Sequence, residues 1–445
     1  MAFVPVYILI LGFTIIIDYF AGIYIERSSG RQRKSLLIVS LIANIGILVI
    51  FKYFNFLNLN FTDLLQNFNY KNPVPYLSIL LPIGLSFHTF QAMSYTIEVY
   101  RGNQKAERHF GIYSLYVMFY PQLVAGPIER PQNLLYQFHK EHKFDYDLMT
   151  SGLRLMAWGL FKKVVIADRL AILVSQVFDH PSYYNSLGLI IATLFFSFQI
   201  YCDFSGYSDI AIGAARTMGF KLMRNFNMPY QSKSIDEFWK RWHISLSTWF
   251  KDYLYIPLGG NRVKIPRWYL NLFIVFLMSG VWHGANWTFI VWGALHGFYL
   301  VFGLLTKNIR SKFNEYTRID KIPLLATITT FMLVAFAWIF FRAQSISSAI
   351  YIIKNIFLGL THIPSQVGQT IQDFSDAGIV KTDLLVSFAL IVFLELVHYL
   401  QKNKNIYQKI LSYPFYYRWS AYYILLLTII LLGVFDNSQF IYFQF

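Results

Sequence analysis

The chain has 445 residues, of which 56% are hydrophobic and only 14% are charged. Soluble domains carry about 25% charged residues, so this composition excludes an ordinary soluble enzyme and predicts a protein of the lipid bilayer. The net charge of +15 fits such a protein because Lys and Arg gather in cytoplasmic loops, and we expect no nucleic acid partner. The single cysteine, Cys202, excludes an intramolecular disulfide and a cysteine-based metal site.

Apolar runs of membrane length recur along the whole chain. They lie at residues 4–24, 36–56, 76–97, 113–125, 152–168, 186–202, 268–284, 286–305, 323–342, 382–400 and 419–435. The first run contains Asp18 and has no basic start or cleavage site, so we interpret it as a membrane helix and not as a signal peptide. The pattern predicts an all-α polytopic membrane protein that forms a single membrane domain over residues 1–445.

The charges of the connecting segments predict which side of the membrane each segment faces. Lys and Arg dominate the segments expected in the cytoplasm, which are 25–35, 101–108, 306–322 and 401–418. Few or balanced charges mark the two segments expected as loops outside, which are 57–75 and 343–381. This alternation predicts that both termini, including the tail 436–445, are extracytoplasmic.

Residues 221–267 interrupt the apolar pattern with many basic side chains and several tryptophans. Read as one helix, the segment has an apolar stripe of Trp239, Trp242, Leu246, Trp249 and Tyr253 and a polar face with Lys240, His243 and Ser247. Such a helix lies in the interface or re-enters the membrane without crossing it. It is either a cytosolic loop anchored by tryptophans or an element that places His243 near a membrane-embedded site.

His283 lies deep in a hydrophobic run, where an ionisable side chain is costly and usually faces a cavity or a partner. The adjacent Gly284 permits a break in the helix at this point. Two interpretations stay open, a functional site and a neutral histidine bonded to a carbonyl. Along a continuous helix His296 would lie about 20 Å away on nearly the opposite face, so we interpret it as a packing or interface residue.

Other polar residues near apolar runs receive structural interpretations. Asp203 and Asp209 are expected to form ion pairs with Lys or Arg, with helix capping or the lining of a cavity as alternatives. His139 and His142 have a spacing that could bind a metal, but their charged surroundings favour a solvated loop. The sequence holds no zinc signature, phosphate-binding glycine loop or nucleophile elbow, and we expect no metal cofactor.

Taken together, these stretches resemble the membrane-bound O-acyltransferase (MBOAT) family, in its bacterial branch of polysaccharide and peptidoglycan O-acetyltransferases. The matching pieces are residues 122–128, 201–209, 236–247, 256–262 and 282–287. The resemblance implies a ring of tilted transmembrane helices, with re-entrant and interfacial helices, around a central tunnel. It also implies residence in the bacterial cytoplasmic (inner) membrane.

The resemblance further implies transfer of an acyl group, expected to be acetyl from acetyl-coenzyme A, to hydroxyls of an exported polysaccharide such as peptidoglycan or an alginate-like polymer. His283 matches the family's membrane-embedded histidine, and His243 matches its second functional position. A histidine can take the proton of an attacking hydroxyl, so we expect His283 to be the general base. His243, Asn286 or a backbone N–H would orient groups or stabilise the oxyanion, and Lys240, Arg241 and Asn286 are candidate ligands of the donor.

The last residues, 440–445, have a Phe-x-Tyr-x-x-Phe pattern. It is similar to the C-terminal motif of the small partner of the family's D-alanyl-transferring member. One hypothesis is that Tyr442 enters the tunnel and accepts the acyl group, which an extracytoplasmic SGNH-type transferase then passes to the polymer. The alternative is an aromatic belt at the membrane interface. Competing functions are D-alanyl transfer to a wall polymer and non-catalytic transport of an acyl carrier or lipid-linked glycan.

Overall fold

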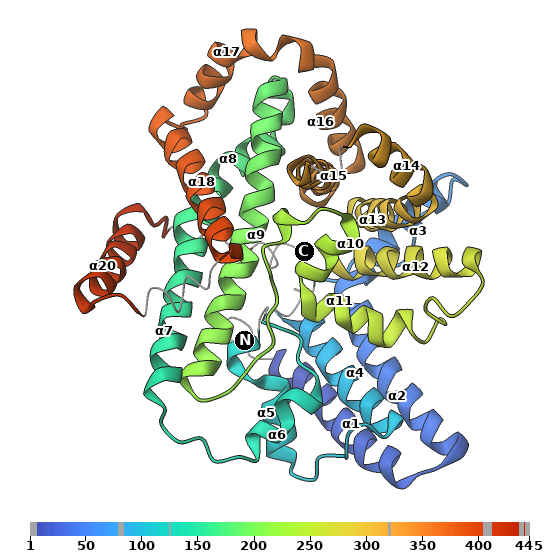
Figure 1. Ribbon diagram of the computed structural model, residues 1–445. Coiled ribbons are helices and arrows are strands. Elements are labelled where there is room, and N and C mark those ends of the chain that lie inside the picture. The colour runs from blue at the N-terminus through green and yellow to red at the C-terminus, as the bar shows by residue number, and fades with distance from the viewer. Residues whose placement is uncertain are drawn as a thin grey trace. The chain divides into compact units, whose positions relative to one another are not determined.

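The computed structural model describes residues 7–78, 84–123, 126–318, 322–403, 412–435 and 440, and within these ranges it is helical and has no strand (Figure 1). Nine helical segments of this described part are long and apolar enough to cross a membrane. The predicted all-α polytopic fold is therefore confirmed. The chain divides into two compact units, the first made of Met1–Leu153 and Ala211–Arg224 and the second of Arg154–Ile210 and Asn225–Phe445.

The second unit holds most of the residues that the sequence marks as functional. Its helices, including two that begin or end in the first unit, are α7 (Tyr146–Leu160), α8 (Asp168–Asp179), α9 (Ser186–Thr217), α10 (Ile235–Arg241), α11 (Ile244–Phe250), α12 (Ile265–His283), α13 (Trp287–Leu305), α14 (Lys307–Thr317), α15 (Pro323–Arg342), α16 (Ile346–Gly359), α17 (Ile363–Asp376), α18 (Lys381–Asn403) and α20 (Phe415–Leu432). A π-helical segment, Phe161–Ala167, joins α7 to α8 without a break.

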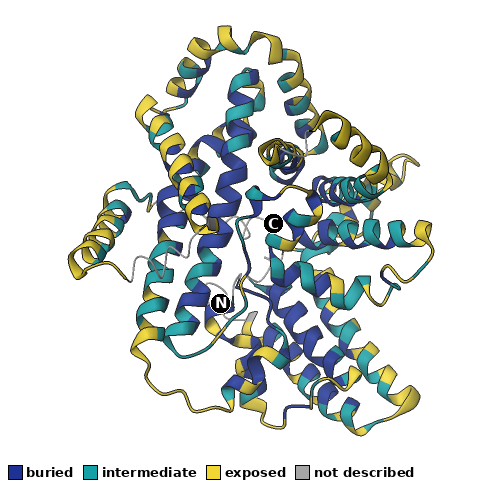
Figure 2. Ribbon diagram, in the orientation of Figure 1, coloured by how far each residue is buried: buried dark blue, intermediate teal, exposed yellow. Residues whose placement is uncertain are grey.

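Burial separates the helices of this unit into inner and outer ones (Figure 2). In α9, 72% of the most apolar stretch is buried, against 6% in α20. The exposed side chains of the outer helices are themselves apolar, as Leu431 on α20 and Val392 on α18 show. Water would not solvate such faces, so lipid is the solvent that they fit.

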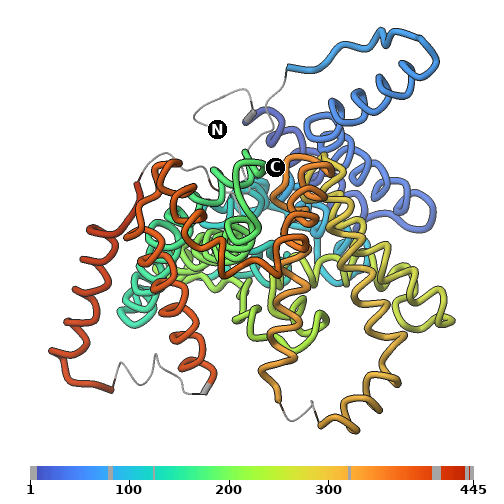
Figure 3. Tube along the Cα trace, turned by 90° about the horizontal axis from the view of Figure 1, so that it is seen from above, coloured from blue at the N-terminus to red at the C-terminus, as the bar shows by residue number. Residues whose placement is uncertain are grey.

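Figure 3 shows that α14, the C-terminal end of α18 and the N-terminal end of α20 lie on one side of the second unit. α14 lies within the basic segment 306–322, and the ends of α18 and α20 lie within the basic segment 401–418. Loop charge predicts a common side for these two segments. α16 and α17 follow the opposite end of α15. The side of the membrane that this side of the unit faces stays a prediction.

The segment 343–381, which loop charge predicts to lie outside, is mostly helical and is not a loop. α16 and α17 occupy it, and Ile346–Asp376 is one of the nine segments long and apolar enough to cross a membrane. Gly359 ends α16, and Pro364 stands in the first turn of α17, where proline is well tolerated. The expected outer loop 57–75 also begins late, because helix continues to Gln66.

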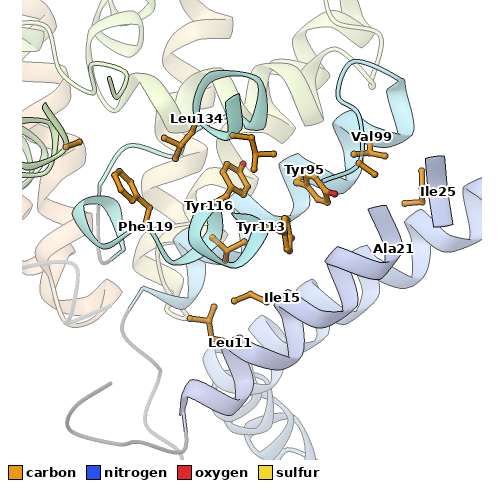
Figure 4. Close-up of a cluster of buried hydrophobic side chains, with 14 residues drawn as sticks. Leu11, Ile15, Ala21, Ile25, Tyr95, Val99, Tyr113, Tyr116, Phe119 and Leu134 are labelled. Carbon is orange, nitrogen blue, oxygen red and sulfur yellow. The ribbon is translucent and has the colours of Figure 1, made fainter. Parts of the chain in front are cut away.

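The first unit packs α1 (Tyr7–Arg27), α2 (Gly30–Leu48) and α4 (Leu85–Arg101) against one another, with α5 (Phe110–Met118) and α6 (Pro131–Phe138) beside α4. α2 runs through a π-helical turn into α3 (Phe54–Gln66). Figure 4 shows the buried core of this unit, where Tyr95, Tyr113 and Tyr116 gather among aliphatic side chains of α1. Asp18, the charged residue of the first run, is fully buried and accepts hydrogen bonds from Ser40 at 2.6 Å and Asn44 at 2.8 Å.

Candidate active site

The helix that carries His283 ends at this residue, and the chain turns back. α12 ends at His283, Gly284 is extended with φ −165°, and α13 begins at Trp287. The two helices pack closely, since a Cβ on Gly280 would lie 3.1 Å from the Cα of Gly293. The continuous helix that would separate His283 from His296 therefore does not exist, and the separate apolar runs 268–284 and 286–305 are confirmed.

His283 lies among aromatic rings and is only 4% exposed. Its ring centroid is 4.9 Å from that of Trp282, 4.9 Å from that of Trp292 and 5.2 Å from that of Phe341. The three rings stand nearly perpendicular to the imidazole, at 73° to 85°. Such edge-to-face packing fixes the imidazole plane, which a residue that transfers protons requires.

The polar segment 221–267 does not form the single helix read from its periodicity. α10 ends at Arg241, and His243 adopts a left-handed conformation with φ +42° before α11 begins. The predicted stripe residues Trp239, Trp242, Leu246 and Trp249 are buried all the same, with the break between them. His243 is 0% exposed while Lys240 is exposed, so the predicted polar face shared by these two residues is wrong.

Asn225 holds His243 in this conformation. The Asn225 side-chain oxygen accepts the Ser245 backbone N–H at 3.2 Å, so it is an acceptor, and it lies 3.0 Å from the His243 Nδ1. His243 therefore donates from Nδ1 and carries its lone pair on Nε2. Burial lowers the pKa of His243 to about 3, so the ring is neutral at cytosolic pH.

The two predicted histidines come together around one indole. The ring of Trp282 is 6.3 Å from the His243 ring and 4.9 Å from the His283 ring. Phe204 of α9 packs edge-on against His243 with ring centroids 4.6 Å apart. The structure thus gathers two buried imidazoles from segments forty residues apart, which is an arrangement suited to moving protons and orienting a substrate.

The predicted donor ligands lie apart from this pair or are engaged elsewhere. Lys240 and Arg241 on α10 form ion pairs with Asp236 at 2.5 Å and Glu237 at 2.6 Å. Asn286 caps α13, because its side-chain oxygen accepts the Thr288 N–H at 3.0 Å, and its amide donates to the Gln344 carbonyl at 3.1 Å. Asn286 therefore shapes the turn after His283, and its role toward a donor stays a prediction.

The expected ion pairs of the α9 aspartates are present, and their partners are two adjacent lysines. Lys163 contacts Asp203 at 2.7 Å, and Lys162 contacts Asp209 at 2.8 Å. Lys162 is 3% exposed and also donates to Ser205 at 2.9 Å. Sequence reasoning did not single out these lysines or Asn225, although two lysines inside the apolar run 152–168 are a signal that could have found them.

The tail lies partly within the described residues. Tyr442 is outside them, but Phe440 is 6% exposed, and its ring is 5.1 Å from that of Tyr207 and 6.3 Å from that of Phe204. The ammonium of Lys163 lies 6.0 Å from the Phe440 ring centre. Phe440 therefore packs on α9 next to the side chain that contacts His243.

The histidine pair predicted in a solvated loop lies in the first unit. His139 binds Glu107 at 2.7 Å, and the His142 Nε2 lies 2.8 Å from the Gln137 carbonyl. Both side chains thus have local partners.

The structure is thus a helical membrane fold that buries His283 at the end of α12 and His243 between α10 and α11. Residues 109–345 match the pattern of MBOAT, the membrane-bound O-acyltransferase family. The chain belongs to this family, and it is a multi-pass membrane acyltransferase.

Three relatives show the range of activities in the family. The chain is 36% identical to the peptidoglycan O-acetyltransferase of Helicobacter pylori over 99% of its own length and 88% of the relative's. It is 39% identical to the probable alginate O-acetylase AlgI of Pseudomonas aeruginosa over 77% of its own length and 64% of the relative's. It is 28% identical to the teichoic acid D-alanyltransferase of Bacillus subtilis over 59% of its own length and 69% of the relative's.

Proposed function

We propose that the protein takes an acetyl group from cytosolic acetyl-coenzyme A and transfers it toward hydroxyls of an extracytoplasmic polysaccharide. Peptidoglycan is the first candidate polymer, and an alginate-like polysaccharide is the second. The observation that carries the proposal is the buried His243–Trp282–His283 cluster in a chain that is 36% identical to a peptidoglycan O-acetyltransferase over 99% of its length. The membrane is the bacterial cytoplasmic membrane, with both termini outside.

His283 is the general base of this reaction. The attacking hydroxyl gives its proton to His283 while its oxygen forms a bond to the thioester carbonyl carbon. The carbon–sulfur bond then breaks, and the thiolate takes the proton from His283 and leaves as a thiol. His243, whose low pKa makes it a weak base, acts through the lone pair of its Nε2 as a hydrogen-bond acceptor that orients the hydroxyl.

The first acceptor of the acetyl group is Tyr442, in a relay that divides the transfer into two steps. The position of Phe440 against Phe204, which itself contacts His243, supports this assignment because Tyr442 is only two residues further along the chain. An extracytoplasmic SGNH-type transferase then moves the group from the phenolic ester to the polysaccharide. If Tyr442→Phe leaves polymer acetylation at the wild-type level, the relay is wrong.

The experiment that tests the proposal measures thiol release from acetyl-coenzyme A by the purified protein in lipid nanodiscs. We expect turnover in the wild type and a loss of at least about 100-fold in His283→Ala, the contribution typical of a general base. His180→Ala, which removes an exposed histidine, is the matched control and keeps wild-type turnover. Turnover that is equal in His283→Ala and in the wild type contradicts the proposal.

D-alanyl transfer to a wall polymer is the second candidate, because the chain also shares 28% identity with a teichoic acid D-alanyltransferase. The same assay distinguishes the two with a second donor. Release of thiol from D-alanyl carrier protein, without turnover of acetyl-coenzyme A, favours the second candidate.

A further inference from the structure

Trp292, which packs on His283, and its neighbour His296 bury N–H groups that have no hydrogen-bond partner in the described part of the chain. They are the indole Nε1 of Trp292 and the Nε2 of His296, and both residues are 0% exposed. Buried polar groups in proteins are nearly always hydrogen-bonded, so two unsatisfied groups on one helix require an explanation.

The contact with Trp239 fixes which nitrogen of His296 carries the proton. The indole Nε1 of Trp239 lies 3.3 Å from the His296 Nδ1. An indole nitrogen can only donate, so Nδ1 accepts and the ring proton is on Nε2. His296 and Trp292 therefore both present donors, and what would satisfy them is an acceptor oxygen.

Trp292 packs on both the candidate base and His296. The Trp292 ring centroid is 4.9 Å from that of His283 and 5.0 Å from that of His296. Trp292 and His296 are four residues apart on α13, so their side chains leave the same face of the helix. Among the other rings packed on them, Trp338, Phe341, Phe238 and Phe276 offer only aromatic faces, which are weak acceptors, and Tyr299 carries a hydroxyl, its ring centroid 5.8 Å from that of His296.

We propose that the N–H groups of Trp292 and His296 bind the carbonyl oxygen of the acyl thioester and stabilise its negative charge during transfer. This inference rests on the proposed function. When the hydroxyl oxygen attacks, the carbonyl electron pair moves onto the oxygen, and two donors that are themselves fully buried stabilise that charge strongly. The pair returns to re-form the carbonyl as the carbon–sulfur bond breaks. The assignment replaces the interpretation of His296 as a packing residue.

The first test compares variants that keep a ring but remove the N–H group. Trp292→Phe and His296→Phe should each lower kcat for thioester turnover by about 100-fold or more, the effect of removing one oxyanion donor, with little change in KM. His296→Gln, which retains an amide donor, should recover part of the loss. Trp268→Phe removes an indole that donates to Tyr255 at the start of α12, and it should keep wild-type kcat. Thermal unfolding of each variant shows whether it is folded.

The second test observes the carbonyl directly. In a His283→Ala background, infrared difference spectra of bound acetyl-coenzyme A labelled with ¹³C at the carbonyl should show a carbonyl stretch shifted to lower frequency. Adding Trp292→Phe or His296→Phe should return the stretch toward its frequency in water-free solvent. This readout does not depend on turnover, and a merely structural role of the two residues would leave it unchanged.

The outcomes separate this inference from the function on which it rests. Wild-type kcat in both Phe variants, beside an inactive His283→Ala, contradicts the donor assignment alone. A carbonyl frequency that none of the variants changes contradicts it as well. A wild type whose thioester turnover does not depend on His283 contradicts the proposed function, and the donor assignment with it.

Discussion

Replacing Asn225 by Ala should release His243 from its fixed conformation. The Asn225 oxygen accepts the Ser245 backbone N–H at 3.2 Å and the Ser245 hydroxyl at 2.9 Å, and it lies 3.0 Å from the His243 Nδ1. All three residues are 0% exposed, so water does not replace the lost acceptor at low cost.

The magnitude follows from the groups left without a partner. The Ser245 hydroxyl can rotate, but the Ser245 N–H and the His243 Nδ1–H cannot. A buried donor left unsatisfied costs about 1–3 kcal/mol, so Asn225→Ala should lower the free energy of unfolding by about 2–6 kcal/mol. Asn225→Asp keeps an acceptor oxygen and should preserve the Nδ1–H tautomer.

Two measurements check this prediction. Thermal unfolding in detergent gives the stability, and ¹⁵N chemical shifts of labelled histidine show whether Nδ1 or Nε2 carries the proton. Asn355→Ala is the control, since Asn355 makes a single exposed bond to the Tyr351 carbonyl and its loss should stay within about 0.5 kcal/mol. An Asn225→Ala protein with wild-type stability and an unchanged His243 tautomer refutes the reasoning.

Three further perturbations have defined outcomes. Gly293→Ala adds a Cβ 3.0 Å from the Gly280 Cα and should lower the free energy of unfolding by about 1–3 kcal/mol, measured by thermal unfolding. The control Gly303→Ala, on the same helix, meets only the end of a flexible arginine at 3.7 Å and should leave stability unchanged. Equal stabilities of the two variants contradict the close packing of α12 and α13. Lys162→Met leaves Asp209 without its cation and should lower the free energy of unfolding by about 2 kcal/mol or more. Adding Asp209→Asn should recover part of this loss. A double variant that is no more stable than Lys162→Met argues against the ion pair. Burial raises the pKa of Glu129 from 4.5 to about 7. The contribution of Glu129 to the free energy of unfolding is therefore full below pH 4.5 and falls by about 3 kcal/mol as the pH rises to 7. Glu129→Gln should remove this part of the pH dependence, and identical profiles of stability against pH in the two proteins contradict the prediction.

Much of the membrane fold could be predicted because lipid imposes a strong compositional rule. Runs 268–284 and 286–305 correspond closely to α12 and α13, since the Gly284–Asn286 break interrupts the apolar pattern visibly. The helices at 343–381 were missed because this segment was interpreted from its charges alone. Loop charge could not reveal them, since that segment carries balanced charges.

The site was predicted less completely, because its geometry depends on contacts distant in sequence. Periodicity continues through Trp242 and His243, so nothing local reveals that His243 adopts a positive φ. The oxygen that fixes its tautomer comes from Asn225, eighteen residues earlier. His296 is buried among aromatic rings, as its interpretation as a packing residue expects, but the sequence does not reveal that the turn after α12 brings its neighbour Trp292 beside His283.

We propose that His283 drives acyl transfer from a cytosolic thioester to a hydroxyl across the membrane. Its most direct test uses proteoliposomes with ¹⁴C-acetyl-coenzyme A on one side and an ester-accepting glycan with the SGNH-type transferase on the other. The account predicts alkali-labile label on the glycan with the wild type and none above background with His283→Ala. Equal labelling by the two proteins, or label that stays with the donor in the wild type, would contradict it.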